Sequence, residues 1–205
     1  MMIAVITGDV VNSRKLSEDW IGTLKGALSD LKCKKKKWEI YRGDSFQLEL
    51  NIEDALLSAI YIKACLKTLK KGDIRVGIGI GHKNRVSHKV TEANGEAFIN
   101  SGMVFDDLEM NKVSMALKTP WVDFDEEFNF YLKLALLTMD SWGQVASEMV
   151  KYAIQNRNVK QDKIASLSGK SQSSVSEALK RAHYAEIMEL ESKYRTRIIN
   201  LTKKA

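Results

Sequence analysis

The chain has 205 residues, of which 44% are hydrophobic and 28% are charged, and it contains two cysteines. This length fits one large domain or a medium domain with a small one, and Cys33 and Cys65 form neither a disulfide framework nor a CxxC metal motif. The opening MMIAVITGDV lacks the basic start of a signal peptide, and no apolar run approaches the roughly 20 residues of a membrane span. We therefore expect a cytoplasmic protein that does not enter a membrane.

The net charge of +6 is unevenly distributed. Residues 1–140 contain 20 basic and 20 acidic side chains, whereas residues 141–205 contain 12 basic and 6 acidic ones. The whole excess lies in the last third, which favours a second module with an anionic partner. A basic helical bundle without such a partner is the alternative.

The first part of the chain alternates strand and helix patterns. The predicted elements are a strand at 3–6, a helix capped by Ser17, a hairpin of strands 38–41 and 45–50, a helix from Asn51 to the Lys70-Lys71-Gly72 exit, and a strand at 74–81. The glycines of the last strand, IRVGIGIG, leave room for a close approach to its backbone. The order is therefore β-α-β-β-α-β.

The remaining elements are mostly helical. We expect a helix at 95–108, a strand at 113–118, a helix capped by Asp140 or Ser141 that runs to about Gln155, a short helix at 161–167, and one long helix from Ser171. Pro120, the only proline, closes the region that contains the strands. We therefore predict an α+β domain over 1–120 and an all-α module over 121–205.

Right-handed crossovers turn β-α-β-β-α-β into a ferredoxin-like, or palm-like, sheet. The first strand then lies between the third and the fourth, which brings Asp9 beside the Gly43-Asp44 hairpin tip. Two nearby carboxylates repel each other unless a cation joins them, and Mg²⁺ or Mn²⁺ with a nucleoside triphosphate would fit such a site. The loop residues Asn12, Ser13 and Arg14 are candidates to hold the phosphates. The alternative is that Asp9 and Asp44 only stabilise turns.

Four segments in order resemble the SatD family of small bacterial proteins and, more distantly, the core of the class III nucleotidyl cyclases. They are ITGDVVNSR, YRGDSFQLEL, IRVGIGIG and NGEAFINSG. The resemblance covers about residues 2–110 for the cyclase core and most of the chain for the SatD family. It implies metal binding by Asp9 and Asp44 and nucleotide contacts from Gly43 and Asn100. Val104 stands where the cyclase transition-state arginine would fall, so the resemblance implies nucleotide binding and puts turnover in doubt.

The segment QDKIASLSGKSQSSVSEALKRA, residues 161–182, resembles a bacterial helix-turn-helix. Gly169 supplies the turn, and Val175 and Leu179 return the second helix to the core. The candidate DNA-binding residues are Lys170, Gln172, Ser173, Ser176, Lys180 and Arg181, with Lys160 and Lys163 as further phosphate partners. Short hydrogen-bonding side chains followed by cations are what a major-groove helix needs. The alternative is an ordinary helical module, and helix-turn-helix folds also mediate protein contacts.

The sequence thus favours a DNA-binding transcriptional regulator with a nucleotide- and metal-binding palm-like domain. A metal-dependent nucleotidyl cyclase or nucleotidyltransferase and a non-catalytic interaction scaffold are the alternatives. Residues 190–201 are expected either to pair with a second copy, giving a homodimer that reads two half-sites, or to dock within the chain. His82 and His88 have no usual zinc spacing and are expected at the surface.

Overall fold

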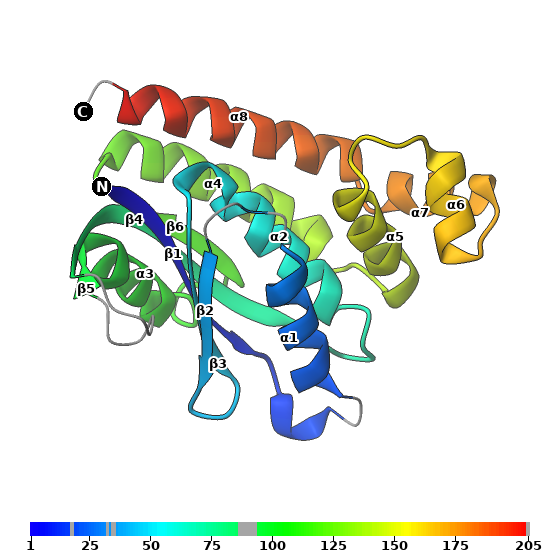
Figure 1. Cartoon of the computed structure of the whole chain (residues 1–205), viewed down its shortest axis with the longest axis horizontal. Helices are drawn as coiled ribbons and strands as arrows, with labels where there is room; N and C mark the ends of the chain where they lie inside the picture. Colours follow the sequence, from blue (N-terminus) through cyan, green and yellow to red (C-terminus); the bar gives the residue numbers. More distant parts are fainter. Residues whose placement is uncertain (17–18, 32, 34–35, 86–93, 204–205) are drawn as a thin grey trace.

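The computed structural model is a mixed α+β structure with a curled antiparallel sheet and several helices (Figure 1). It describes residues 1–205 except 17–18, 32, 34–35, 86–93 and 204–205. The strands are β1 (Met2–Val10), β2 (Lys36–Tyr41), β3 (Ser45–Leu50), β4 (Ile74–Arg85), β5 (Asn94–Gly95) and β6 (Met115–Lys118). The helices are α1 (Trp20–Asp30), α2 (Ala55–Leu66), α3 (Glu96–Asp107), α4 (Val122–Met139), α5 (Gln144–Gln155), α6 (Gln161–Ser168), α7 (Gln172–Arg181) and α8 (Tyr184–Thr202), with short 3-10 turns η1 (Ser13–Lys15) and η2 (Ile52–Asp54).

The strands lie in the order β2-β3-β1-β4-β5, and β6 pairs with β4 in parallel. Strand β1 is antiparallel to both of its neighbours, β3 and β4, which is the position that the β-α-β-β-α-β order predicted. The last residues of β1 pair with the first residues of β3, so that Asp9 lies opposite Ser45. The two acidic segments singled out in the sequence therefore meet at one end of the sheet.

Helices α1 and α2 pack on one face of the sheet. The side chains that alternate toward this face, such as Ile6, Leu48 and Ile78, are fully buried in the core. Helix α2 is buried around almost its whole circumference because α1, α5 and α8 also contact it. This burial explains why α2 is apolar throughout and lacks one clear apolar stripe.

Helix α3 packs on the other face, directly over the glycines of β4. A Cβ added to Gly79 would lie 2.2 Å from both the Ala97 carbonyl oxygen and the Ser101 backbone nitrogen, and one added to Gly77 would lie 2.7 Å from backbone atoms of α3. The room that these glycines leave is therefore filled by a helix of the same chain.

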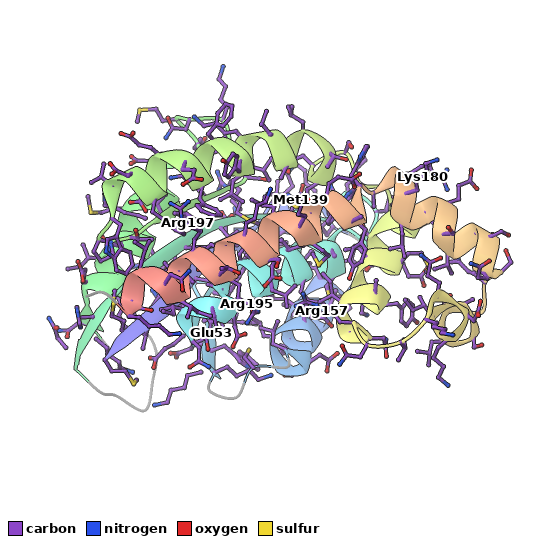
Figure 2. All side chains as sticks on the ribbon, turned by 90° about the horizontal axis from the view of Figure 1, so that it is seen from above. Glu53, Met139, Arg157, Lys180, Arg195 and Arg197 are labelled. Carbon is purple, nitrogen blue, oxygen red and sulfur yellow. The ribbon has the colours of Figure 1, made fainter. Side chains whose placement is uncertain are left out.

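Helices α4 and α8 lie side by side over the sheet, as both views show (Figures 1 and 2). The rings of Phe124 and Phe128 stack at 4.3 Å, and Tyr194 of α8 packs against both of them. Tyr194 is fully buried and its hydroxyl donates to the Ile52 carbonyl oxygen at 2.8 Å. Residues on both sides of the expected boundary at 120 therefore share one continuous core. Residues 190–201 dock within the chain, which was one of the two expectations for them.

The predicted long helix from Ser171 is wrong, because the chain bends at His183. This residue adopts the left-handed conformation, with φ 51° and ψ 39°, and separates α7 from α8. No glycine or proline marks the bend, so the apolar spacing continues through it in the sequence. The bend leaves α7 as a short helix with its own exposed face.

Two predicted helix caps are also placed differently. Helix α5 begins after Gly143, whereas Asp140 forms a 2.7 Å ion pair with Lys63 and accepts a hydrogen bond from Ser114. Helix α1 begins after Asp19, whose carboxylate accepts a hydrogen bond from the Gly22 backbone; Ser17 lies outside the described residues. None of the described helices is long and apolar enough to cross a bilayer.

Candidate functional site

Asp9 and Asp44 lie at the same end of the sheet, where β1 ends and the β2–β3 hairpin turns. The backbone nitrogen of Val10 donates to the Asp44 carbonyl oxygen at 3.2 Å, which joins the two segments. We call this region the acidic rim. The two acidic segments meet here, but their carboxylates bind different partners: Asp9 binds Arg75 and Asp44 binds Ser13.

The carboxylate of Asp9 is bound by Arg75 from β4, the residue directly opposite it in the β1–β4 pair. Nε of Arg75 donates to Oδ1 at 3.1 Å and its Nη2 donates to Oδ2 at 2.6 Å, so the contact is bidentate. These hydrogen bonds raise the pKa of the Arg75 guanidinium above its ordinary value. Arg75 also contacts Glu109 at 3.3 Å. The positive charge that neutralises Asp9 is thus supplied by the chain itself.

Asp44 and the loop after β1 form a second set of contacts. The hydroxyl of Ser13 donates to Oδ2 of Asp44 at 2.5 Å, and Ser13 is buried. Asn12 and Gly43 adopt left-handed conformations, with φ 53° and 86°, and Arg14 lies exposed in η1. The predicted phosphate-binding loop therefore lies beside Asp44, and its serine is used to hold the hairpin tip.

A divalent cation does not fit the acidic rim in this arrangement. Arg75 already donates to both oxygens of Asp9, so a cation would have to displace it. Within the described part of the chain, no three His, Cys, Asp or Glu side chains are gathered to hold a metal ion. His82 is exposed at the surface, and His88 lies outside the described residues.

Asn100 lies apart from the acidic rim, in the contact between α3 and β4. Its side-chain amide is buried and donates to the Ile80 carbonyl oxygen at 2.8 Å. Val104, on the same helix, lies within 2.8 Å of a Cβ built on Gly77. Both residues thus serve the packing of α3 on the glycines, and the structure does not bring Asn100 together with Asp9 and Asp44.

Helices α6 and α7 and the turn between them occupy the segment where the sequence predicts a helix-turn-helix. Three residues, 169–171, separate the two helices, and Gly169 takes the left-handed conformation that ends α6, with φ 66°. Ser171 caps α7, since its hydroxyl accepts a hydrogen bond from the Ser174 backbone nitrogen at 3.2 Å. The apolar side chains expected to join the helices are buried: Ile164, Ala165, Val175 and Leu179. Helix α5 packs on both helices and completes a three-helix unit.

The outer face of α7 is polar and open. Gln172, Ser173, Lys180 and Arg181 are exposed, and Ser176 is half-buried. Ser173, Lys180 and Arg181 lie on the side of the helix away from Val175 and Leu179, whereas Gln172 and Ser176 lie nearer to the buried side. The unit lies at one end of the molecule, away from the sheet (Figure 1), and Figure 2 labels Lys180 at that end. Most of the predicted DNA-contacting side chains of α7 are therefore accessible.

The flanking cations are placed less uniformly. Lys160 and Lys163 are exposed at the start of α6. Lys170, in the turn, is half-buried and lies 3.5 Å from the carboxylate of Glu148 on α5. The ion pair of Lys170 thus joins the turn between α6 and α7 to α5.

Glu177 is a residue of this face that the sequence reasoning missed. It is exposed and lies one turn after Ser173 and three residues before Lys180, so all three side chains share one side of α7. A carboxylate repels phosphates but accepts a hydrogen bond from the amino group of cytosine. The i, i+4, i+7 spacing of Ser173, Glu177 and Lys180 in the sequence would have placed Glu177 on this face.

The three-helix unit is joined to the body through buried polar contacts. The indole nitrogen of Trp142 donates to the Ala182 carbonyl oxygen at 3.0 Å, which ties the end of α7 to the start of α5. Glu191 of α8 is fully buried and accepts from Arg157 at 3.1 Å and from Arg195 at 3.0 Å. A buried carboxylate needs such partners, so these contacts hold the unit in a fixed orientation.

Lys63 forms a second junction at the end of α2. Its ammonium group is fully buried and lies 2.7 Å from both Asp73 and Asp140. Asp140 directly follows α4, so this network fixes where the chain leaves the body toward α5.

Comparison of the chain with known proteins found no relative. No protein-family model matches the chain, and neither a curated protein nor a solved structure matches it.

Proposed function

We propose that the protein is a DNA-binding regulator that contacts the major groove with α7. The observation that carries this proposal is the exposed side of α7, where Ser173 precedes Lys180 and Arg181 and is flanked by Gln172 and Ser176. Short hydrogen-bonding side chains at the start of a helix suit base edges, and cations at its end suit phosphates. The excess charge of +6 within residues 141–205 is consistent with a polyanionic partner.

A mobility-shift assay on fragments from the neighbourhood of the protein's own gene would test this proposal. We expect one fragment to bind at least about tenfold more tightly than unrelated DNA at moderate salt, with an affinity that falls steeply as salt rises. A basic protein of similar charge serves as the control for non-specific attraction. Binding no stronger or more selective than that control would contradict the proposal.

The sheet is consistent with a ferredoxin-like or palm-like fold. Its four long strands follow the order β2-β3-β1-β4, and all neighbouring pairs are antiparallel. Two helices on one face, α1 and α2, also suit that fold. Membership of the SatD family would account for such a sheet and a helix-turn-helix in one chain.

Nucleotide binding at the acidic rim is a second proposal, favoured by the backbone contact that brings the segments of Asp9 and Asp44 to one end of the sheet. It requires Arg75 to release Asp9, because the guanidinium occupies the place of a cation. We propose no turnover there, since Val104 stands where the charge-stabilising arginine of the cyclases would fall.

A further inference from the structure

A cavity of about 580 Å³ lies where the body of the molecule meets the three-helix unit. One part of its lining comes from the end of α1 and the start of α2, and the other from the end of α5, the turn after α5 and α8. Small-molecule sites have volumes of about 300–1,000 Å³. Neither the acidic rim nor the DNA-contacting side of α7 uses this cavity, so its role is open.

The charges that line the cavity sum to zero. Two carboxylates, Asp30 and Asp54, and two guanidinium groups, Arg157 and Arg195, face it. Asp54 and Arg195 neutralise each other, since both Nη atoms of Arg195 lie 3.3 Å from Oδ1 of Asp54. Asp30 and Arg157 come from different elements, and within the described residues no ion pair joins them. A simple anion or a simple cation would therefore meet both attraction and repulsion here.

Asp30 and Arg157 keep hydrogen-bonding groups that the chain does not use. The Asp30 carboxylate is exposed, and the one hydrogen bond that it accepts within the described chain, from the Gln155 amide, is 3.4 Å long. Arg157 donates to Glu191 through Nη2, and its Nε and Nη1 have no hydrogen-bond partner among the described residues. The cavity thus offers an acceptor for an ammonium group and donors for a carboxylate.

Apolar surface forms a further part of the lining. Leu31, Leu57 and Ile154 contribute to it. The hydroxyl of Tyr61 accepts a hydrogen bond from Gln155 at 2.7 Å, so this polar group is engaged within the chain. A ligand that fits the cavity therefore has apolar groups as well as two opposite charges.

We propose that the cavity binds a dipeptide with apolar side chains. Its ammonium group would bind Asp30 and its carboxylate would bind Arg157. Its side chains would lie against Leu57 and Ile154, and the exposed amide of Asn158 would bond its peptide group. A dipeptide is favoured over a free amino acid because the cavity has the volume of a larger ligand. This inference goes beyond the proposed function and does not rest on it.

Calorimetric titration of the full chain with leucyl-leucine, valyl-valine and alanyl-phenylalanine tests the inference. We expect at least one of them to bind with a dissociation constant below about 1 mM. The N-acetylated form of that dipeptide lacks the ammonium group and its C-terminal amide lacks the carboxylate, so each should bind at least about tenfold more weakly. Dissociation constants above about 1 mM for all three dipeptides, or equal affinities for the free and blocked forms, overturn the inference. Tighter binding of inorganic phosphate than of any dipeptide also overturns it.

Asp30→Asn isolates the ammonium contact. This variant should bind the dipeptide at least about tenfold more weakly and should bind the N-acetylated form as the wild type does, because that compound has no cation for Asp30. Asp30 is exposed, so we expect a native circular dichroism spectrum. Asp106→Asn, which removes an exposed carboxylate of α3, is the matched control and should change neither affinity. Wild-type affinity of Asp30→Asn for the dipeptide would overturn the inference.

Mobility shifts separate this inference from the proposed function. A chain that binds the dipeptide and no DNA supports the inference and contradicts the DNA-binding proposal, whereas a chain that binds DNA and no dipeptide does the reverse.

Discussion

Arg75 holds the Asp9 carboxylate through both oxygens, at 3.1 Å and 2.6 Å, at the position where the sequence predicts a metal ion. Arg75 is about one third exposed, so the pair is only partly shielded from water. The guanidinium therefore both satisfies Asp9 and competes with any cation for it.

Arg75→Ala should uncover whatever affinity the acidic rim has for a cation. We expect Mn²⁺ to bind at least about tenfold more tightly to this variant than to the wild type, because a competing positive charge is lost. Calorimetric titration measures the difference. The double variant Arg75→Ala/Asp9→Asn is the control and should lose the gain. If all three proteins show the same negligible affinity for Mn²⁺, the proposed nucleotide site does not include a metal ion.

Lys180→Ala combined with Arg181→Ala should weaken DNA binding across all sequences, because both side chains are expected to contact phosphates. Each lost contact should lower the slope of log affinity against log salt by about 0.9. Both side chains are exposed, so thermal unfolding should stay unchanged. Lys25→Ala provides a control cation outside the three-helix unit. An unchanged salt slope would show that α7 does not face the phosphates.

Glu177→Ala should change which DNA is bound more than how tightly DNA is bound. Removing a carboxylate from the reading face should raise affinity for unrelated DNA and reduce discrimination at one base pair by about 1–3 kcal/mol. Selection from a randomised DNA pool, followed by comparison of the enriched sequences, measures both effects. Enriched sequences identical to those of the wild type would place Glu177 outside the interface.

Gly79→Ala should destabilise the fold, because its Cβ would lie 2.2 Å from backbone atoms of α3 that cannot move independently. We expect a loss of about 1–3 kcal/mol in the free energy of unfolding, measured with urea. Gly102→Ala on α3 is the matched control, since a Cβ there meets nothing within 4 Å. That change should stabilise the helix by about 0.5–1 kcal/mol. The reverse order of the two effects would contradict the packing of α3 on β4.

We predict that the protein loses stability at alkaline pH because the thiol of Cys65 is buried. Burial raises the pKa of its thiol from 9.0 to about 11. The unfolded thiol loses its proton near pH 9 and the folded one near pH 11, so below pH 9 both are protonated. Between these values the unfolded state is favoured, and the free energy of unfolding should fall by on the order of 2 kcal/mol. Cys65→Ala should show a smaller fall between about pH 8.5 and about pH 10.5 in urea titrations. The buried tyrosines remain in both proteins, so an identical fall would assign the effect to them.

The meeting of Asp9 with the hairpin tip was predictable because strand order and right-handed crossovers restrict how β1 and β3 pair. The role of Arg75 was not, since it depends on the register of β1 with β4, which places Arg75 opposite Asp9. The role of Asn100 was not predictable either. The motif resemblance indicated that Asn100 contacts a nucleotide, whereas the glycines of β4 bring α3 so close that the Asn100 side-chain amide donates to the Ile80 carbonyl oxygen.

In the helical part of the chain, too, some features were predictable from the sequence and others were not. Gly169 and the apolar spacing of Ile164, Val175 and Leu179 were sufficient to predict α6 and the beginning of α7, but not its end. The bend at His183 was not predictable, because a left-handed residue that is neither glycine nor asparagine gives no local signal. The bend depends on the tertiary structure, in which Tyr194 of α8 is buried against α4.

The bend at His183 has a mechanical consequence. Because α8 is anchored along the body by Tyr194 and Arg195 and only Ala182 and His183 separate it from α7, α7 is joined to the body without a flexible linker. If α7 binds DNA as proposed, the duplex would lie in one set orientation relative to the sheet, with no swivel between them.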